Sequence, residues 1–373
     1  MTYKNPFILN VYSGPEYFCN RVNETKVIID AFKNQRNLTL ISHRRMGKSG
    51  LIKHVFHKLR NASSFKLFYV DIMNTEKLSD LVELLAKEVI GKVDNQTLRV
   101  LKKFSSLVKS LSPKISVDPL TGLPEIEIVA NHEVPPETSL SEIFVYLQGQ
   151  KKQIIIAFDE FQQILNYPEK NIEAILRKHI QQLSSTNFIF SGSHKHLLVS
   201  MFGQHGKPFY QSSEILYLDK IDGRAYKKFI KSHFKKDNRT IDNKALNLVI
   251  EYAHGHTFYV QYLCNKLYET QQEIIDSSMV STTLFSILEE NEVFYYNFRN
   301  LLTSFQYKLL KAIAKEKVVT KPTSKIFIRK YDLGTPSSVK TGLKALLAKE
   351  LVYSDQKEIR VYDVFFSLWL ARK

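Results

Sequence analysis

The sequence of 373 residues has little cysteine, glycine and proline, and it has no long apolar run. Two cysteines, Cys19 and Cys264, are too few for a disulfide framework or a cysteine-based metal site. Thirteen glycines and eleven prolines favour helices and compact loops over disorder. No stretch approaches the ~18 apolar residues of a membrane span, and the first residues lack the apolar run of a secretory signal. These absences predict a cytoplasmic protein without a membrane partner.

Basic residues are in excess, with 53 Lys and Arg against 37 Asp and Glu and a formal net charge of +16. Such a balance is typical of proteins with a polyanionic partner, although many soluble proteins are simply rich in lysine. Phe and Tyr are abundant, with 24 and 19 residues, so the chain can bury large cores. Its length predicts two or three domains.

Residues 37–59 predict a strand, a phosphate-binding loop and a helix. Leu38, Leu40 and Ile41 form a buried apolar run, and apolar residues recur at helical spacing after Ser49. The loop between them ends in Gly-Lys-Ser, so backbone N–H groups and a helix N-terminus would face a phosphate group. Lys48 would reach the β- and γ-phosphates, and the Ser49 hydroxyl would ligate Mg²⁺. The predicted ATP-binding residues are Ser42, Arg44, Arg45, Met46, Gly47, Lys48, Ser49 and Gly50.

One position departs from the usual phosphate-loop pattern. The first residue of the eight is normally Gly, and here it is Ser42. A serine fits there only if its backbone stays outside the left-handed region. The alternative interpretation is a strand, a turn and a helix with a surface lysine.

A second group of residues predicts the catalytic carboxylates. Residues 154–158 form a continuous apolar run, as in a central strand buried on both faces, and Asp159 and Glu160 follow it. Ligands of open α/β sheets bind at the carboxyl ends of the strands. Asp159 would support Mg²⁺, and Glu160 would orient the water that attacks the γ-phosphate. The alternative is that both residues cap the following helix.

The rest of the first 220 residues fits the same sheet. Runs at 65–71 and 187–193 predict further strands, and 215–218 adds another, so that strands alternate with helices as in a parallel sheet covered on both faces. Ser193, after one of these strands, is a candidate to sense the γ-phosphate, or else it belongs to a plain turn. Residues 113–136 alternate polar and apolar around a turn with Pro119 and Gly122 and predict a β-hairpin insertion, either a docking arm or a surface excursion.

The remaining residues predict two further domains. Helical patterns at 221–302 predict a lid over the nucleotide, and 303–373 read as three helices and a β-wing, that is, a winged helix-turn-helix. This last segment holds fifteen Lys and Arg against six Asp and Glu. If it binds duplex DNA, its groove-facing residues would be Ser337, Ser338, Lys340, Thr341 and Lys344. Aromatic residues at 294–298 would stack on bases or pack between domains.

Several of these motifs together resemble the archaeal-type ATPases, in the STAND branch of the AAA+ P-loop NTPases. The matching stretches are Phe18-Cys19-Asn20-Arg21 with Glu24, residues 44–49, Ile156-Ala157-Phe158-Asp159-Glu160-Phe161-Gln162, Gly192-Ser193, Pro208-Phe209-Tyr210, Arg360-Val361-Tyr362-Asp363 and Trp369-Leu370. The resemblance implies ATP and Mg²⁺ binding, a helical lid and a C-terminal winged helix. The lid motif of the branch, usually Gly-x-Pro, reads Gly255-His256-Thr257 here.

The sequence therefore predicts an α/β P-loop ATPase with a lid and a winged helix, acting as a slow nucleotide-dependent switch. Lys48 and Glu160 are the predicted catalytic residues, and Asp159 and Ser49 the predicted Mg²⁺ ligands. Two alternatives stay open, a regulator that binds DNA and uses ATP only as a ligand, and a scaffold that binds a protein client or itself.

Overall fold

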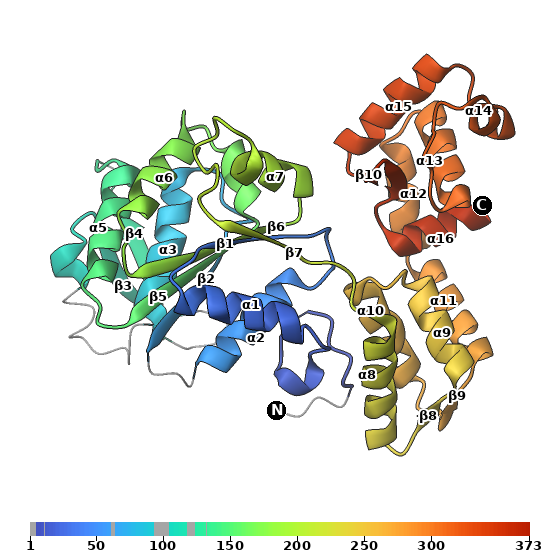
Figure 1. Cartoon of the computed structure of the whole chain (residues 1–373), viewed down its shortest axis with the longest axis horizontal. Helices are drawn as coiled ribbons and strands as arrows, with labels where there is room; N and C mark the ends of the chain where they lie inside the picture. The colour runs from blue at the N-terminus through green and yellow to red at the C-terminus, as the bar shows by residue number, and fades with distance from the viewer. Residues whose placement is uncertain (1–4, 11, 61–63, 93–103, 118–123, 132) are drawn as a thin grey trace. The chain divides into compact units, whose positions relative to one another are not determined.

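The computed structural model describes residues 5–10, 12–60, 64–92, 104–117, 124–131 and 133–373. Its contacts divide the chain into two compact units (Figure 1). The first unit comprises residues 11–219 and holds the predicted phosphate-binding loop. The second comprises residues 1–10 and 220–373 and holds the predicted lid and winged helix. None of the helices described has both the length and the apolar character that crossing a bilayer requires.

A five-stranded parallel sheet forms the centre of the first unit. Its spatial order is β2-β5-β6-β1-β7, and every neighbouring pair is parallel. The strands are β1 (Leu38–Ile41), β2 (Phe65–Asp71), β5 (Gln153–Asp159), β6 (Thr186–Gly192) and β7 (Glu214–Tyr217). The predicted α/β class is thus confirmed, and each predicted strand is present.

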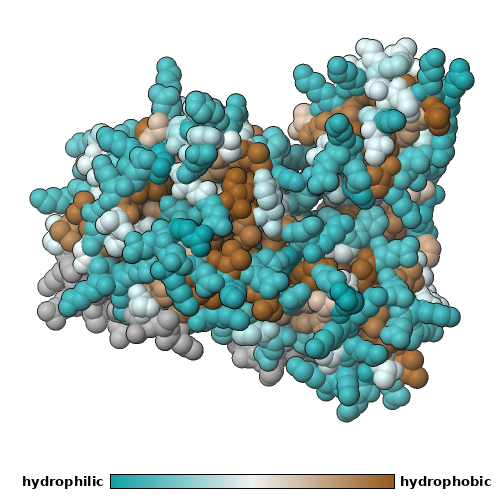
Figure 2. Space-filling view, in the orientation of Figure 1, coloured by the Kyte–Doolittle hydropathy of each residue, from teal (hydrophilic) through white to brown (hydrophobic). Residues whose placement is uncertain are grey.

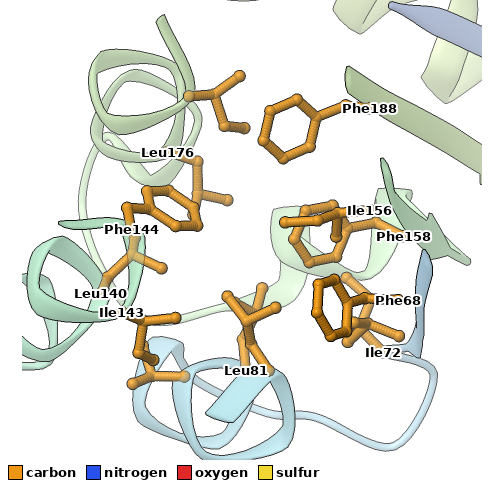
Figure 3. Close-up of a cluster of buried hydrophobic side chains, with 14 of the residues drawn as sticks. Phe68, Ile72, Leu81, Leu140, Ile143, Phe144, Ile156, Phe158, Leu176 and Phe188 are labelled. Atoms are coloured by element: carbon orange, nitrogen blue, oxygen red, sulfur yellow. The ribbon is translucent and has the colours of Figure 1, made fainter. Parts of the chain in front are cut away.

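Both faces of this sheet are buried under helices, which explains the continuous apolar runs. In β5, Ile154, Ile156 and Phe158 face one core, whereas Ile155 and Ala157 face another. The first core also includes Phe68, Leu81, Ile143, Phe144, Leu176 and Phe188 (Figure 3). It is covered by α3 (Leu78–Lys92), α5 (Pro136–Gln148), α6 (Ile172–Gln181) and α7 (Lys195–Gly203), and the second by α1 (Val22–Lys33) and α2 (Lys48–Leu59).

The predicted hairpin is present, and its base is part of the core. Strand β3 (Leu111–Val117) pairs antiparallel with β4 (Pro124–Ala130). Leu111 and Ile128 are buried in the core that α3 and α5 cover. The connection at 118–123 lies outside the described residues. Because its base is packed, the hairpin is not an arm that is free along its whole length.

The second unit begins with the helices of residues 221–302, for which the name lid is kept; that they cover the nucleotide stays a prediction. They are α8 (Gly223–Lys236), α9 (Asn243–Tyr252), α10 (Thr257–Glu269), α11 (Ser277–Glu290) and α12 (Glu292–Asn300), with short parallel strands β8 (Thr240–Ile241) and β9 (Ile274–Ile275). Asp222, Asp242 and Asp276 accept backbone hydrogen bonds at the starts of α8, α9 and α11. These caps fix where the helices begin.

A winged helix follows, as predicted. It comprises α13 (Ser304–Glu316), α14 (Lys325–Tyr331), α15 (Pro336–Ala348) and the antiparallel wing β10 (Val352–Asp355) and β11 (Glu358–Val361). Thr303 and Gln306 form a capping box on α13, and Thr335 caps α15 with Pro336 at its first position. The boundary between lid and winged helix at residue 303 stays a prediction.

A final helix, α16 (Val364–Arg372), was left unassigned by the sequence patterns because almost every residue in it is apolar, which hides the helical period. Its rings pack on α12. The Tyr295 ring lies 5.2 Å from Phe366 and 5.5 Å from Trp369, and the Phe298 ring lies 5.1 Å from Phe366. These contacts favour the packing interpretation of the aromatic residues at 295–298 over base stacking.

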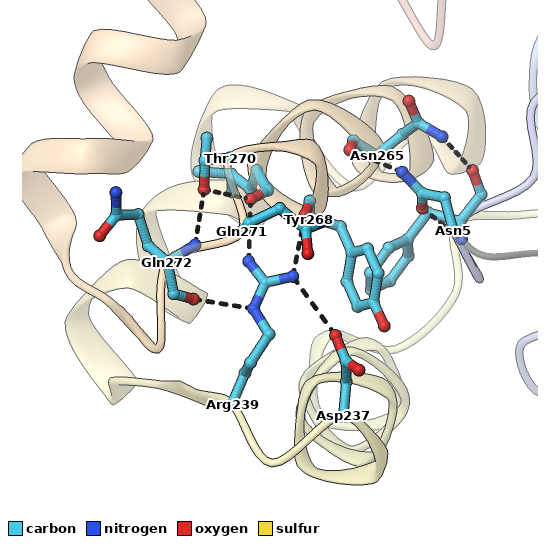
Figure 4. Close-up of polar contacts among 10 residues, drawn as sticks. Asn5, Asp237, Arg239, Asn265, Tyr268, Thr270, Gln271 and Gln272 are labelled. Atoms are coloured by element: carbon cyan, nitrogen blue, oxygen red, sulfur yellow. Dashed lines mark hydrogen bonds and ion pairs between the residues drawn. The ribbon is translucent and has the colours of Figure 1, made fainter.

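The N-terminal segment packs on the lid. Asn5 Nδ2 donates to the Asn265 carbonyl at 2.9 Å, and Asn265 Nδ2 donates back to the Phe7 carbonyl at 2.7 Å (Figure 4). The Phe7 ring is fully buried beside Phe234 and Tyr268. The contacts therefore place residues 5–10 with the lid, whereas the sequence analysis grouped residues 1–220 together.

Arg239 is buried in the lid and holds the end of α10 (Figure 4). Its guanidinium donates to the carbonyls of Gln272 at 2.7 Å and Tyr268 at 2.8 Å, and it lies over the Tyr268 ring at 4.6 Å. The last carbonyls of a helix lack partners within the helix. One buried side chain therefore donates to carbonyls at and just beyond the end of α10.

We expect Arg239→Met to destabilise the second unit by about 3 kcal/mol, since it removes the donor to buried carbonyls. Urea unfolding followed by circular dichroism would measure the loss. Arg224→Met is the matched control, because the Arg224 side chain is 93% exposed and its pair with Asp222 lies at the surface. Equal stability of the two variants would contradict this role of Arg239.

Candidate nucleotide-binding site

The loop between β1 and α2 has the backbone of a phosphate-binding turn. Arg45 and Gly47 adopt positive φ angles of 66° and 89°, and α2 begins directly afterwards at Lys48. Ser42 is not among the residues with positive φ, so a side chain is tolerated at that position. Ser42 can therefore replace the usual glycine, since its backbone lies outside the left-handed region.

Lys48 is buried at the start of α2 and lies against its own loop. Its ammonium donates to Ser42 Oγ at 3.2 Å and to the His43 carbonyl at 3.3 Å. Burial lowers the pKa of Lys48, and the carboxylates of Glu160 and Asp159 act in the opposite direction. The side chain is therefore an inward-pointing cation close to two carboxylates and not a surface lysine.

Asp159 lies at the end of β5 and collects donors from three other elements. Ser49 Oγ and Tyr69 OH each donate to Oδ2 at 2.5 Å, and Ser191 Oγ donates to Oδ1. Desolvation is the largest cause that raises the pKa of Tyr69, and the Asp159 charge adds to it. The structure thus brings together Ser49 and Asp159, the two predicted Mg²⁺ ligands.

Glu160 is held by a different set of donors. Ser193 donates to Oε2 through its N–H at 3.1 Å and through its hydroxyl at 2.8 Å, and Gln162 Nε2 donates to the same oxygen at 2.7 Å. The backbone of Glu160 is left-handed, with φ of 55°. This conformation is uncommon for a residue other than glycine, and it turns the chain sharply after β5.

The other predicted loop residues surround this centre. Met46 is buried, Arg44 and Gly50 are half-buried, and Arg45 is exposed. Sequence reasoning gave no role to Arg21, whose buried guanidinium donates to the Met46 carbonyl at 3.2 Å and to Glu24 at 2.8 Å. Arg21 thereby ties the start of α1 to the loop. Its only signal in the sequence was its place in the motif that carries the family resemblance.

Tyr69, Ser191 and Gln162 are further residues whose roles the sequence analysis missed. Tyr69 and Ser191 lie on the strands that flank β5, so they meet Asp159 only once the order of the strands is known. Gln162 follows the carboxylates by two positions and reaches back to Glu160. A polar residue inside an otherwise apolar strand, such as Ser191, was the one available signal.

The candidate DNA-contacting residues all lie on α15. Ser337, Ser338, Lys340, Thr341 and Lys344 are exposed, whereas Val339 and Leu346 of the same helix are buried. Hydrophilic residues dominate the visible face of the protein (Figure 2). The polar face of α15 is therefore accessible on the winged helix.

The second unit also contains a strongly basic pocket, formed by the lid and the winged helix. It is lined by Lys220, His254, His256, Lys317, Tyr353, Arg360, Val361, Tyr362, Val364 and Ser367. Burial, together with the charges of Lys220, Arg360 and Lys317, lowers the pKa of His254 to about 4. The imidazole is therefore neutral at neutral pH.

This shift predicts a loss of stability in acid. The folded protein binds the His254 proton less readily than the unfolded chain, whose ordinary pKa is 6.5. Stability should therefore fall as the pH drops from about 6.5 towards about 4, by at most about 3 kcal/mol. His254→Asn, which suits the positive φ of 47° at this position, should lose less over the same range. Urea unfolding at several pH values would measure the difference, with His205→Asn as an exposed control.

Comparisons with known proteins agree with this fold. A family model described as an ATPase domain predominantly from Archaea matches residues 18–263, and one described as a probable winged helix domain matches residues 293–372. An uncharacterized ATP-binding protein of Methanocaldococcus jannaschii is 23% identical over 324 residues, which cover 78% of this chain and 86% of the relative.

Solved structures show the same architecture along nearly the whole chain. A Walker-type ATPase of Pyrococcus abyssi superposes with a TM-score of 0.67 at 17% identity, covering 98% of this chain and 99% of the other. The ORC2 protein of Aeropyrum pernix gives 0.60 at 15% identity, covering 98% and 95%. ORC1 of the same organism, solved in complex with DNA, gives 0.53 at 12% identity, covering 96% and 94%.

The fold and the loop geometry define a P-loop ATPase-like domain followed by a winged helix. Because the family model covers most of the chain, this protein belongs to the family of ATPase domains found predominantly in Archaea. The resemblance found in the sequence is thereby confirmed at the level of the family.

Proposed function

We propose that this protein binds ATP with Mg²⁺ and hydrolyses it, and that the bound nucleotide sets the arrangement of the P-loop unit relative to the lid and winged helix. One observation carries the proposal. The phosphate-loop Ser49 and the strand-end Asp159 share a hydrogen bond of 2.5 Å beside the buried Lys48. The naming of the Methanocaldococcus relative as an ATP-binding protein supports it.

The donor set fits Mg²⁺. The Ser49 hydroxyl and the Asp159 carboxylate are hard oxygen ligands, and Mg²⁺ usually takes one or two of these while it keeps several waters. Accordingly, the described residues contain no larger cluster of His, Cys, Asp and Glu that could enclose a metal. When bound, Mg²⁺ would neutralise charge on the phosphates.

The protein's own residues would bind the phosphates and activate the attacking water. The loop N–H groups and the N-terminus of α2 bind phosphate oxygens, and Lys48 points its ammonium towards the β- and γ-phosphates. Glu160 orients the attacking water and accepts its proton. Ser193, whose hydroxyl donates to Glu160, is the residue that we propose senses the γ-phosphate.

The experiment that tests this proposal is ATP turnover by the purified full-length protein with Mg²⁺, measured as phosphate release. We expect turnover that is slow and that requires Mg²⁺. ATP binding without turnover would support the alternative of a regulator that uses ATP as a ligand. Absence of ATP binding would overturn the proposal.

We further propose that the winged helix contacts duplex DNA through α15, since its polar face is exposed and basic and since the similar ORC1 protein was solved with DNA. Reversing two charges with Lys340→Glu and Lys344→Glu should weaken duplex binding at least about tenfold and flatten its salt dependence. Fluorescence anisotropy at several salt concentrations would measure both.

The matched control reverses two exposed lysines at the same helical spacing on α8, Lys231→Glu and Lys235→Glu. It changes the net charge equally. If both double variants weaken DNA binding to the same extent, the contact is not specific to α15. If neither does, the scaffold alternative gains support.

A further inference from the structure

Gln162 is buried next to the predicted base, yet the proposed chemistry gives it no task. It lies in the turn of 3-10 helix at Phe161–Asn166 that follows β5, and 4% of its surface is exposed. Its amide points back and donates to Glu160 Oε2 at 2.7 Å. A polar side chain buried this deeply normally has all its hydrogen-bonding atoms satisfied.

The Gln162 amide does not form all of its possible hydrogen bonds in this position. Its oxygen, Oε1, is buried and has no partner among the described residues. Exchanging the positions of the amide oxygen and NH₂ group would add no hydrogen bond. A carboxylate oxygen accepts hydrogen bonds only, so it must face the NH₂ group. Gln162 thus leaves one atom unpaired and keeps its donor on Glu160.

Gly192 makes room for this arrangement. A Cβ atom at residue 192 would lie 1.9 Å from Gln162 Oε1 and 3.1 Å from its Cδ. The absence of a side chain at residue 192, at the end of β6 and directly before Ser193, thus leaves space for the Gln162 amide. Gly192 therefore admits the Gln162 side chain, and Gln162 and Ser193 both donate to the Glu160 carboxylate.

The hydrogen bonds to Glu160 differ in whether they can persist when another acceptor enters the site. Ser193 has a single hydroxyl proton, so that its hydroxyl cannot donate to Glu160 and to a phosphate at the same time. The Gln162 amide is enclosed in the protein, and among the described residues its hydrogen bond goes to Glu160. This bond can persist while the Ser193 hydroxyl changes partner.

We propose that Gln162 is a positioning residue that anchors Oε2 of Glu160 and leaves Oε1 as the oxygen that receives the proton of the attacking water. The Gln162 amide and both donors of Ser193 all bind Oε2. The inference rests on the proposed ATP hydrolysis with Glu160 as base.

The test replaces the amide by an apolar side chain of similar length, Gln162→Met. We expect kcat for ATP to fall about tenfold while the Kd for Mg·ATP changes less than about twofold, as for an interaction that acts on the chemical step.

The neighbouring residue provides the control. Gln163 Nε2 donates to the Thr75 carbonyl at 2.9 Å and not to the Glu160 carboxylate, so Gln163→Met should leave kcat unchanged. Gly192→Ala keeps the amide but displaces it, and it should reproduce the effects of Gln162→Met. Similar effects of both glutamine variants would overturn the proposal.

A second measurement does not depend on turnover. A crystal structure of Gln162→Met should show the Glu160 carboxylate displaced from its position in the wild type. An unchanged carboxylate position overturns the proposal whether or not ATP is hydrolysed. A displaced carboxylate with unchanged kcat also overturns it, since the anchor would then be without effect on the reaction. Lack of turnover in the wild type, by contrast, is a failure of the proposed hydrolysis itself.

Discussion

Glu160→Gln is expected to lower ATP turnover by about 10²–10³-fold while ATP binding stays within about threefold of the wild type. The amide has nearly the same shape as the carboxylate, and its oxygen can still accept from Ser193 and Gln162. What is lost is the group that takes a proton from the attacking water. Steady-state phosphate release and calorimetric titration with Mg·ATP would measure the two quantities.

The control for this variant is Glu137→Gln, at an exposed position of α5. It removes one negative charge from the same unit without touching the site, so turnover should not change. Full activity of Glu160→Gln would move the role of base to another group. The nearby Asp71, whose pKa burial raises, would then be the first to test.

Lys48→Met is expected to weaken ATP binding without lowering the stability of the ligand-free protein. Burial lowers the pKa of Lys48, which shows that its charge is held at a cost in the folded chain. An apolar side chain of similar length should leave the ligand-free protein at least as stable, with a gain of up to about 2 kcal/mol. The affinity for Mg·ATP should fall about 100-fold, because the buried cation that faces the phosphates is gone.

Urea unfolding without nucleotide and calorimetric titration with Mg·ATP would measure both effects. Lys58→Met, at an exposed position of the same helix, should change neither. A variant that loses stability and retains ATP affinity would contradict the placement of Lys48 in the phosphate site.

The sheet and the loop could be predicted because their signals are local. A strand buried on both faces requires a continuous apolar run, and residues 154–158 provide one. The phosphate loop could be inferred from Gly47, Lys48 and Ser49 between a strand and a helix. In both cases the residues that form the feature are neighbours in the sequence.

The donors around the carboxylates could not be predicted, because they depend on the order of the strands. Tyr69 on β2 pairs in register with Ala157, and Phe190 on β6 pairs with Phe158. This register brings Tyr69 and Ser191 to Asp159 from opposite sides. No pattern within β2 or β6 alone shows which strand will lie between them.

The path of the chain between the two units has a further consequence. The chain leaves the second unit after residue 10, builds the whole P-loop unit, and returns at residue 220. In terms of topology, the ATPase sheet is an insertion within the unit that carries the lid and winged helix. A proteolytic cut at the first crossing would leave residues 11–373 as one covalent chain, whereas a cut at the second would leave residues 220–373 attached only through their noncovalent contacts. The P-loop unit is thus connected to the second unit at both of its ends, at residues 10–11 and 219–220.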